Sequence, residues 1–434
     1  SYFFPKKGTR TGVLFLYSVG MIYFQNSFYW QFHSWMKLLV ILSAIVTIKG
    51  QSRIDGQIVD KETGEPLIGV NVFISKTSIG TTTDKDGLYT IKNISNGRYE
   101  LVISMIGYTM EKKELNLFAN ARLAMDFRLT TEPINMKEII VTKKSNKQWK
   151  KDYKVFKNAF LGNSENGKSC KIINEYVLSF DRGENIFTAS AQRPLIIENM
   201  RLGYVITYYL NGFTTNNALL RYDDESFFKF FFISSTQFVR YAGESYFTEM
   251  EPKSERQKRQ WIKNRQIAYN GSLRHFLATL GKRFDRRYKM NGDNLRQRND
   301  WLLISGSKID PLTEEGFEVY PKEENRKGYD YRELLNDSLV WSTKNDNELL
   351  LSFKDKMMVK FNREGEELNY RFYTFNSDNK PKIYQTSFLQ LGKDSVIFDK
   401  NGRYFERFMI EKQEYMGWER VGDQLPFDYK PIQD

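Results

Sequence analysis

Between Arg53 and Leu129, apolar and polar residues alternate in short runs that turn residues separate. Alternation places one face of a strand in a core and the other in water, so it predicts β-strands and not helices. Two sheets packed face to face bury such runs. The pattern therefore predicts a small β-sandwich over residues 51–130. Its runs are IDGQIVD, GVNVFIS, TTTDKDGLYTI, GRYELVISMIGY and ARLAMDFRL.

Two acidic residues beside a glycine, in TTTDKDGLYTI, raise the question of a calcium site. An EF-hand loop that began at Asp84 would need an oxygen ligand at its fifth position and a Glu at its twelfth. Those positions hold Leu88 and Ser95, so the pattern does not fit. Asp-Gly between alternating runs instead favours a hairpin turn, in which glycine adopts positive φ without penalty. We therefore expect Asp86 and Gly87 to form a structural turn, and we expect no metal site.

After a basic linker at residues 131–150, strand patterns predominate again over residues 151–434, with one exception. From Ser254 to about Arg283, apolar residues recur at helical spacing while Lys and Arg fill the other positions. This predicts one long amphipathic helix that Ser254 caps and in which Gly271 is a weak point. We thus expect a larger, strand-rich α+β domain. A second turn like that at Asp86 is expected at Gly402, in DKNGRY.

The first fifty residues are apolar and aromatic and contain no acidic residue. Residues 36–50 have the arrangement of a signal peptide, with Lys37 before an apolar stretch too short to span a bilayer. Residues 1–35 are then an upstream read-through or a fragment end. The competing interpretation joins the two apolar stretches of this region in a membrane hairpin. We expect export, with the mature chain beginning near Gln51.

The formal net charge is +12, and residues 253–289 carry twelve Lys or Arg against only Glu255 and Asp285. This segment contains the candidate anion-binding residues. In an exported protein the available anions are lipid headgroups, lipopolysaccharide or acidic glycans, and nucleic acid is not an expected partner. The alternative is that the cations form only the solvated face of a packed helix. The candidates are Arg256, Arg259, Lys263, Arg283, Arg286 and Arg287.

Catalytic chemistry has few candidate residues. The chain has one cysteine, Cys170, and two histidines, His33 and His275, too few for a zinc site of the usual Cys and His ligands. His275 lies between apolar residues, which favours a packed histidine, and Cys170 has no partner of the kind that activates a thiol. We expect neither a catalytic residue nor a cofactor. Neighbouring carboxylates are numerous, including Glu314-Glu315 and Glu366-Glu367, and leave a carbohydrate-active hydrolase as an alternative.

The ordered series GQIVDKETGEPLIGVNVFI, GTTTDKDGLYTI and GRYELVISMIGY resembles the carboxypeptidase regulatory-like domain, a transthyretin-like sandwich of Gram-negative envelope proteins. The resemblance implies turn and core roles, and no catalytic role, for the motif residues. EPINMKEIIVT, residues 132–142, also resembles the segment that joins such a domain to the plug of a TonB-dependent receptor. The motif residues are Gly64, Pro66, Gly69, Asp86, Gly87, Tyr89, Gly107 and Tyr108.

These observations together predict a non-enzymatic binding or assembly protein of the periplasm or outer membrane. The sandwich would act as a docking or spacer module, and the larger domain would bind an envelope protein or a glycan. The hydrolase stays open as one alternative. The other is a binder of anionic lipid or lipopolysaccharide through the basic helix.

Overall fold

The structure, a computed structural model, describes residues 51–118, 120–132, 147–216, 238–291, 311–322, 339–373, 382–406 and 408–432. The segment predicted as upstream sequence (1–35) and the predicted signal peptide (36–50) lie outside these residues, as does most of the predicted linker, 131–150. Residues Ser52–Asp434 form one compact unit. Among the residues described, no helix is both long and apolar enough to cross a lipid bilayer.

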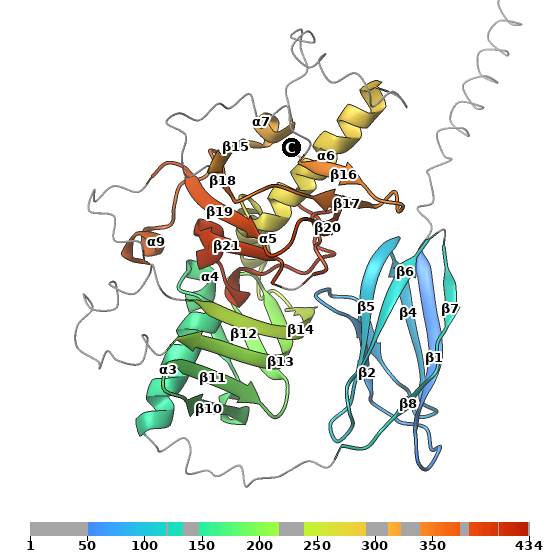
Figure 1. Cartoon of the computed structure of the whole chain (residues 1–434). Coiled ribbons are helices and arrows are strands. Elements are labelled where there is room, and N and C mark those ends of the chain that lie inside the picture. The colour runs from blue at the N-terminus through green and yellow to red at the C-terminus, as the bar shows by residue number, and fades with distance from the viewer. Residues whose placement is uncertain are drawn as a thin grey trace, which may run out of the picture. The chain divides into compact units, whose positions relative to one another are not determined.

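The N-terminal part of this unit is a sandwich of two sheets (Figure 1). One sheet has the order β4-β1-β7, and β8 pairs with the end of β1; the other has the order β3-β2-β5-β6. The first sheet consists of β1 (Ser52–Asp60), β4 (Leu88–Ile94), β7 (Arg122–Ala124) and β8 (Phe127–Leu129). The second consists of β2 (Asn71–Ile74), β3 (Gly80–Thr82), β5 (Gly97–Ser104) and β6 (Glu111–Leu117).

The alternation in the sequence accounts for the core of the sandwich. Ile54 and Ile58 of β1 are fully buried, and so are Leu101 and Ile103 of β5 in the facing sheet. In both strands these residues are separated by even numbers of positions, so their side chains point to the same face. All four belong to one apolar core between the sheets.

The turn at Asp86-Gly87 differs from the prediction in what it connects. It joins β3 to β4, which belong to different sheets, so it is not the turn of a hairpin. Gly87 does have positive φ, at 69°. The Asp84 carboxylate accepts hydrogen bonds from the backbone N–H groups of Asp86 (3.0 Å) and Leu88 (2.9 Å). A turn closed by its own Asp side chain forms whether or not the strands around it pair, which is why the sequence could not separate the two cases.

A six-stranded antiparallel sheet follows, with the order β10-β11-β13-β12-β9 and with β14 paired to β13. It is preceded by α3 (Lys147–Leu161) and α4 (Glu165–Lys168). Its strands are β9 (Cys170–Ile172), β10 (Leu178–Arg182), β11 (Ile186–Ala191), β12 (Leu195–Asn199), β13 (Tyr204–Asn216) and β14 (Val239–Glu249), and η1 (Glu175–Val177) lies between β9 and β10.

α3 lies against this sheet (Figure 1), and aromatic side chains pack the helix onto it. Phe156 meets Phe213 edge to face, with ring centroids 4.9 Å apart. One turn further along the helix, Phe160 meets Tyr208 in the same way at 5.0 Å. Spacing of four residues puts both phenylalanines on one face of the helix. This aromatic face, with Trp149, fixes α3 over the sheet.

The remaining chain forms a second core around α6. A four-stranded sheet has the order β15-β18-β19-β21, and a three-stranded sheet has the order β16-β17-β20. The helices are α5 (Glu255–Tyr269), α6 (Leu273–Asn291), α7 (Pro311–Glu315), α9 (Leu368–Tyr373), α10 (Tyr415–Trp418) and η5 (Val421–Asp423). The strands are β15 (Phe317–Lys322), β16 (Val340–Ser342), β17 (Glu348–Leu351), β18 (Lys356–Phe361), β19 (Gln385–Leu391), β20 (Val396–Asp399) and β21 (Ile410–Glu414).

The predicted fold class is confirmed: the protein is mainly β, with an N-terminal sandwich and a larger strand-rich region after it. The larger region has two separate apolar cores, one between α3 and the six-stranded sheet and one around α6.

Candidate functional site

The predicted basic helix is two helices. The Ser254 hydroxyl caps α5 by accepting a hydrogen bond from the Gln257 N–H, as predicted, but α5 ends at Tyr269 and α6 begins at Leu273. Gly271 lies between them with φ of +70°. A left-handed residue cannot continue a right-handed helix, so the prediction of a single helix was wrong. The glycine that the sequence marked as a weak point is the bend itself.

The structure brings together three of the six candidate anion-binding residues. Arg256, Arg259 and Lys263 are exposed on the outer face of α5, and none of their side chains forms an ion pair or hydrogen bond with another described residue. Arg283 lies on the second helix, α6, and is half-buried. Arg286 and Arg287 fall in the end of α6 whose side chains lie outside the described part of the chain.

Another basic residue of α5, Arg265, points inward and is buried. Its guanidinium donates hydrogen bonds to the backbone oxygens of Leu202 (2.8 Å) and Gly203 (3.2 Å). It also stacks over the Tyr204 ring at 4.0 Å and forms an ion pair with Glu249 at 3.0 Å. All this fixes α5 against the turn before β13. Arg265 is therefore a structural residue, which a pattern of charges alone does not reveal.

Arg274 of α6 has an equivalent structural role at the C-terminal tail. Its guanidinium donates to the backbone oxygens of Pro426, Phe427 and Tyr429, each at 2.8 Å. These bonds hold the C-terminal tail, which follows Gln424, against α6. The guanidinium groups of Arg265 and Arg274 are both bonded to backbone carbonyls, which leaves neither available to a ligand.

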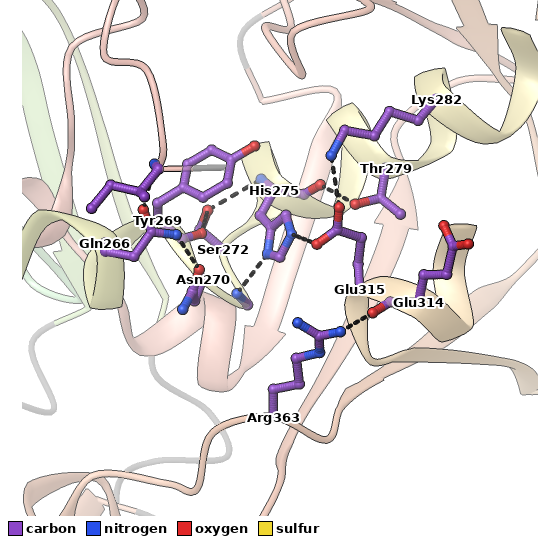
Figure 2. Close-up of polar contacts among 12 residues, drawn as sticks. Gln266, Tyr269, Asn270, Ser272, His275, Thr279, Lys282, Glu314, Glu315 and Arg363 are labelled. Carbon is purple, nitrogen blue, oxygen red and sulfur yellow. Dashed lines mark hydrogen bonds and ion pairs between the residues drawn. The ribbon is translucent and has the colours of Figure 1, made fainter. Parts of the chain in front are cut away.

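His275 lies at the start of α6 (Figure 2). Only 5% of its surface is exposed. Nδ1 accepts a hydrogen bond from the Gly271 N–H at 3.1 Å, and Nε2 lies 3.4 Å from Glu315 Oε2. Because Nδ1 is an acceptor, the proton of the neutral ring is on Nε2 and faces the carboxylate. Lys282 forms an ion pair with the other oxygen of Glu315 at 2.6 Å.

The ionisation states of this cluster follow from its surroundings. Burial lowers the pKa of His275. The hydrogen bond from His275, together with Lys282, lowers the pKa of Glu315 to about 2. At neutral pH the cluster therefore consists of a neutral imidazole, a carboxylate and an ammonium group. Arg363 lies nearby and donates to the backbone oxygen of Glu314 (Figure 2).

A serine near His275 does not complete a catalytic triad. The Ser272 hydroxyl donates a hydrogen bond to the backbone oxygen of Tyr269 at 2.6 Å. It accepts one from the backbone N–H of His275 at 3.2 Å, so it caps α6 and does not contact the imidazole ring. In a Ser-His-acid triad the imidazole must accept the hydroxyl proton. Here the ring nitrogen that could accept it is bonded to Gly271.

A group of carboxylates that the sequence did not reveal lies around the C-terminal tail. Burial raises the pKa values of Glu364, Glu367, Glu419 and Asp423, most strongly that of Glu419. All four are partly exposed, but protein surrounds them on most sides and disfavours their charged forms. Burial lowers the pKa of Lys412, and the nearby charge of Glu419 acts in the opposite direction.

Two of these carboxylates tie distant segments together. Asp423 Oδ1 accepts hydrogen bonds from the Ser164 hydroxyl (2.6 Å) and from Asn166 Nδ2 (3.1 Å). Glu367 Oε2 accepts one from the backbone N–H of Glu165 at 3.0 Å, at the start of α4. The partners are more than 200 positions apart in the sequence, so no local motif could predict the group. Within the described residues, no group of three or more His, Cys, Asp or Glu side chains is arranged to hold a metal ion.

Cys170 is buried, and its thiol donates to the backbone oxygen of Asn166 at 3.3 Å. Burial raises the pKa of the thiol to about 12. The thiolate is the nucleophilic form, so this cysteine is inert at neutral pH.

The predicted turns have closely similar geometry. Gly402 has φ of +77°, and Asp399 accepts hydrogen bonds from the N–H groups of Asn401 and Arg403, as Asp84 does at its own turn. Gly107 has φ of +89°, and the hydroxyl of the neighbouring Tyr108 donates to Asp60 at 3.0 Å.

The sandwich contacts the six-stranded sheet through the loop between β2 and β3. The Lys76 N–H donates to the Ser245 oxygen (2.7 Å), and the Phe247 N–H donates to the Thr77 oxygen (3.0 Å). The loop thus forms a short β-bridge with β14, at the edge of that strand that does not pair with β13. Such pairing is the usual way in which an exposed strand edge is covered.

Side chains reinforce this contact. Glu244 of β14 is only 1% exposed; it accepts a hydrogen bond from the Ser75 hydroxyl at 2.5 Å and forms an ion pair with Lys112. Phe73 of the sandwich stacks on Tyr209 of β13, with ring centroids 5.3 Å apart. Polar and aromatic contacts both hold the sandwich in place, and nothing in the sequence pattern indicated them.

Comparison with known proteins concerns this sandwich. Residues 54–141 match the family model of the CarboxypepD_reg-like domain. The resemblance seen in the sequence is thereby confirmed for this part of the chain. The TonB-dependent receptor P39 of Formosa agariphila is 32% identical over 106 residues, which are 24% of this chain and 10% of that receptor. The chain therefore covers only a tenth of this relative's length.

Solved structures are also similar to about a fifth of the chain. The 5-hydroxyisourate hydrolase of Klebsiella pneumoniae is 19% identical, with a TM-score of 0.17; the match covers 19% of this chain and 91% of that one. The pilus 2b backbone protein of group B streptococcus is 18% identical, with a TM-score of 0.17, and the match covers 19% of this chain and 42% of that one.

Proposed function

We propose that the chain is a non-enzymatic binding protein of the bacterial envelope, and that the outer face of α5 is its binding surface. One observation carries the proposal: Arg256, Arg259 and Lys263 are exposed side by side on one helix face and have no partner among the described residues. Solvent-exposed helix faces commonly alternate charges of both signs, whereas Glu255 is the only acidic residue of α5. An anionic partner would supply the opposite charge.

The envelope location is supported by the CarboxypepD_reg-like domain and by the similarity to a TonB-dependent receptor. In this proposal the sandwich is a docking module that acts within the chain. It covers the edge of β14 through Lys76 and Thr77 and so supports the domain that carries α5. Fractionation of the cells that make the protein tests the location, and recovery in the cytosol would contradict it.

Retention on an anionic polysaccharide matrix tests the binding surface. Residues Ser52–Asp434, a compact unit by themselves, should be retained and should elute as salt rises. The variant Arg256→Gln/Arg259→Gln/Lys263→Gln should elute at clearly lower salt. If the variant and the unsubstituted protein elute together, another surface binds the matrix and the proposal fails.

A carbohydrate-active hydrolase is a second candidate, and the carboxylates around the C-terminal tail favour it. Glycosidases need one carboxyl group with a raised pKa as the acid and a second carboxylate nearby. Burial raises the pKa of Glu419, and the nearby negative charge of Glu367 also raises it. Turnover of an oligosaccharide library by Ser52–Asp434, abolished in Glu419→Gln, would support this candidate over the first. No turnover of any library member would exclude it.

A further inference from the structure

The outer face of α5 combines cations with exposed aliphatic side chains. Ile262 and Ile267 are 40% and 39% exposed, although both are large apolar residues. The only acidic residue of the helix is Glu255, at its first position, where a negative charge favours the helix dipole. The face consists of Arg256, Lys258, Arg259, Ile262, Lys263 and Ile267.

The opposite face of α5 is fixed to the protein, so the outer face cannot turn inward. Trp261 is buried, and its Nε1 donates to the Met200 oxygen at 2.9 Å. Asn264 donates to the Arg201 oxygen at 2.8 Å. With the contacts of Arg265 to the same turn, four successive backbone carbonyls hold the helix. The apolar side of this amphipathic helix is thus already occupied by protein, and only its charged side faces outward.

We propose that this face binds the surface of a bilayer that contains anionic phospholipids. The proposal rests on the proposed function and names its partner. The four cations are complementary in charge to a layer of phosphate groups. Each Lys or Arg near such a surface strengthens binding by about fivefold. Ile262 and Ile267 lie among the cations, where they reach the outer part of the headgroup layer. The helix lies on the membrane and does not enter it.

A lipid surface fits this face better than a folded protein does. Protein interfaces are centred on Trp, Tyr and Arg side chains buried in well-packed pockets, and the outer face offers exposed Arg but no aromatic residue to build such a centre. It consists mainly of long, flexible cations, which lose conformational freedom when a rigid partner immobilises them. Mobile headgroups rearrange around such side chains, so less of that freedom is lost.

Sedimentation with vesicles tests the proposal. The protein is Ser52–Asp434, which leaves out the apolar residues 1–50, and the vesicles contain phosphatidylglycerol and phosphatidylcholine in equal parts, or phosphatidylcholine alone. The test variant is Arg256→Gln/Arg259→Gln/Lys263→Gln. The matched control is Lys61→Gln/Lys85→Gln/Lys92→Gln, which removes the same charge from exposed positions of the sandwich.

We expect binding to the phosphatidylglycerol vesicles, no binding to phosphatidylcholine alone, and roughly 100-fold weaker binding by the α5 variant. The sandwich control should bind within about twofold of the unsubstituted protein. Raising NaCl from about 0.1 M to about 1 M shortens the Debye length from about 10 Å to about 3 Å and should abolish binding.

Three results would overturn the proposal. If both triple variants lose affinity equally, net charge and not α5 drives binding. If binding survives high salt, the contact is not electrostatic. If the protein does not bind anionic vesicles, but the α5 variant still binds the polysaccharide matrix more weakly than the unsubstituted protein does, the proposed function stands and its partner is an acidic glycan.

Discussion

The backbone N–H of Gly271 donates a hydrogen bond to Nδ1 of His275, and this bond closes the bend between α5 and α6. On one side of the bend, α5 is fixed to the turn before β13. On the other side, α6 belongs to the second apolar core. The histidine therefore holds together the point at which the chain passes from one core to the next.

Replacing His275 with Phe should destabilise the protein by about 1–3 kcal/mol, because the Gly271 N–H would be left buried without an acceptor. A phenyl ring keeps the contacts that the imidazole makes with Tyr269 and Phe317, at 4.8 and 4.9 Å between ring centroids. The measurement is the free energy of unfolding in urea at pH 8. A cost below about 0.5 kcal/mol would show that the bond contributes little.

The same histidine should make stability depend on pH. Its pKa is about 6.5 in the unfolded chain, and burial lowers it in the folded protein. Below pH 6.5 the unfolded chain binds more protons, so the free energy of unfolding should fall as pH decreases through 6.5. His275 is the only histidine of Ser52–Asp434.

His275→Phe should therefore lose less stability than the unsubstituted protein between pH 7.5 and pH 5.5. That range lies above the window in which Glu315, with a pKa of about 2, loses its own contribution. Equal losses in the two proteins would mean that His275 does not cause the dependence.

Two glycines have nearly the same φ but different surroundings. Substituting each with alanine therefore distinguishes the cost of backbone strain from the cost of a steric clash. At Gly271 (φ +70°) a Cβ would lie 2.3 Å from Gln385 Oε1 and 2.9 Å from the Phe361 ring. At Gly64 (φ +74°) it would meet nothing within 4 Å. Gly64→Ala should cost about 1–2 kcal/mol from the left-handed conformation alone, and Gly271→Ala about 2–5 kcal/mol. Equal costs in urea unfolding would contradict the close packing at the bend.

Glu244→Ala should weaken the attachment of the sandwich, because Ser75 loses its hydrogen-bond partner in a buried position at a cost of about 1–3 kcal/mol. Residues 52–129 contain no tryptophan, so tryptophan fluorescence reports unfolding of the larger region alone. In the unsubstituted protein, fluorescence and far-UV circular dichroism should give coincident transitions.

In Glu244→Ala the two transitions should separate. Glu114→Ala is the control, because Glu114 is paired with Arg98 at the surface and such pairs contribute about 0–1 kcal/mol. Transitions that stay coincident in Glu244→Ala would show that its contacts do not couple the two parts.

The sequence predicts the sandwich because each of its strands carries its own signal. Ile54 and Ile58 mark the buried face of β1 locally, and the motif around Gly87 lies within the match to the CarboxypepD_reg-like domain. The helical period, by contrast, continues across Gly271, since α5 and α6 both bury apolar residues. Periodicity alone therefore predicts one helix where the glycine makes two.

The candidate site was only partly predictable for a similar reason. Charge patterning identified Arg256 and Arg259 on the outer face of α5, but it could not distinguish them from Arg265, whose guanidinium is bonded to carbonyls of the turn before β13. Contacts such as that of Asp423 with Ser164 depend on how distant segments pack. Only the tertiary structure contains that information.

Because the loop at Lys76 and Thr77 bonds to the edge of β14, the sandwich also shields the backbone oxygen of Ser245 and the backbone N–H of Phe247, which would otherwise be open to other chains. A truncated protein that begins after residue 130 would expose this strand, and self-association through it is then expected. We therefore expect the N-terminal sandwich to protect the rest of the molecule from aggregation.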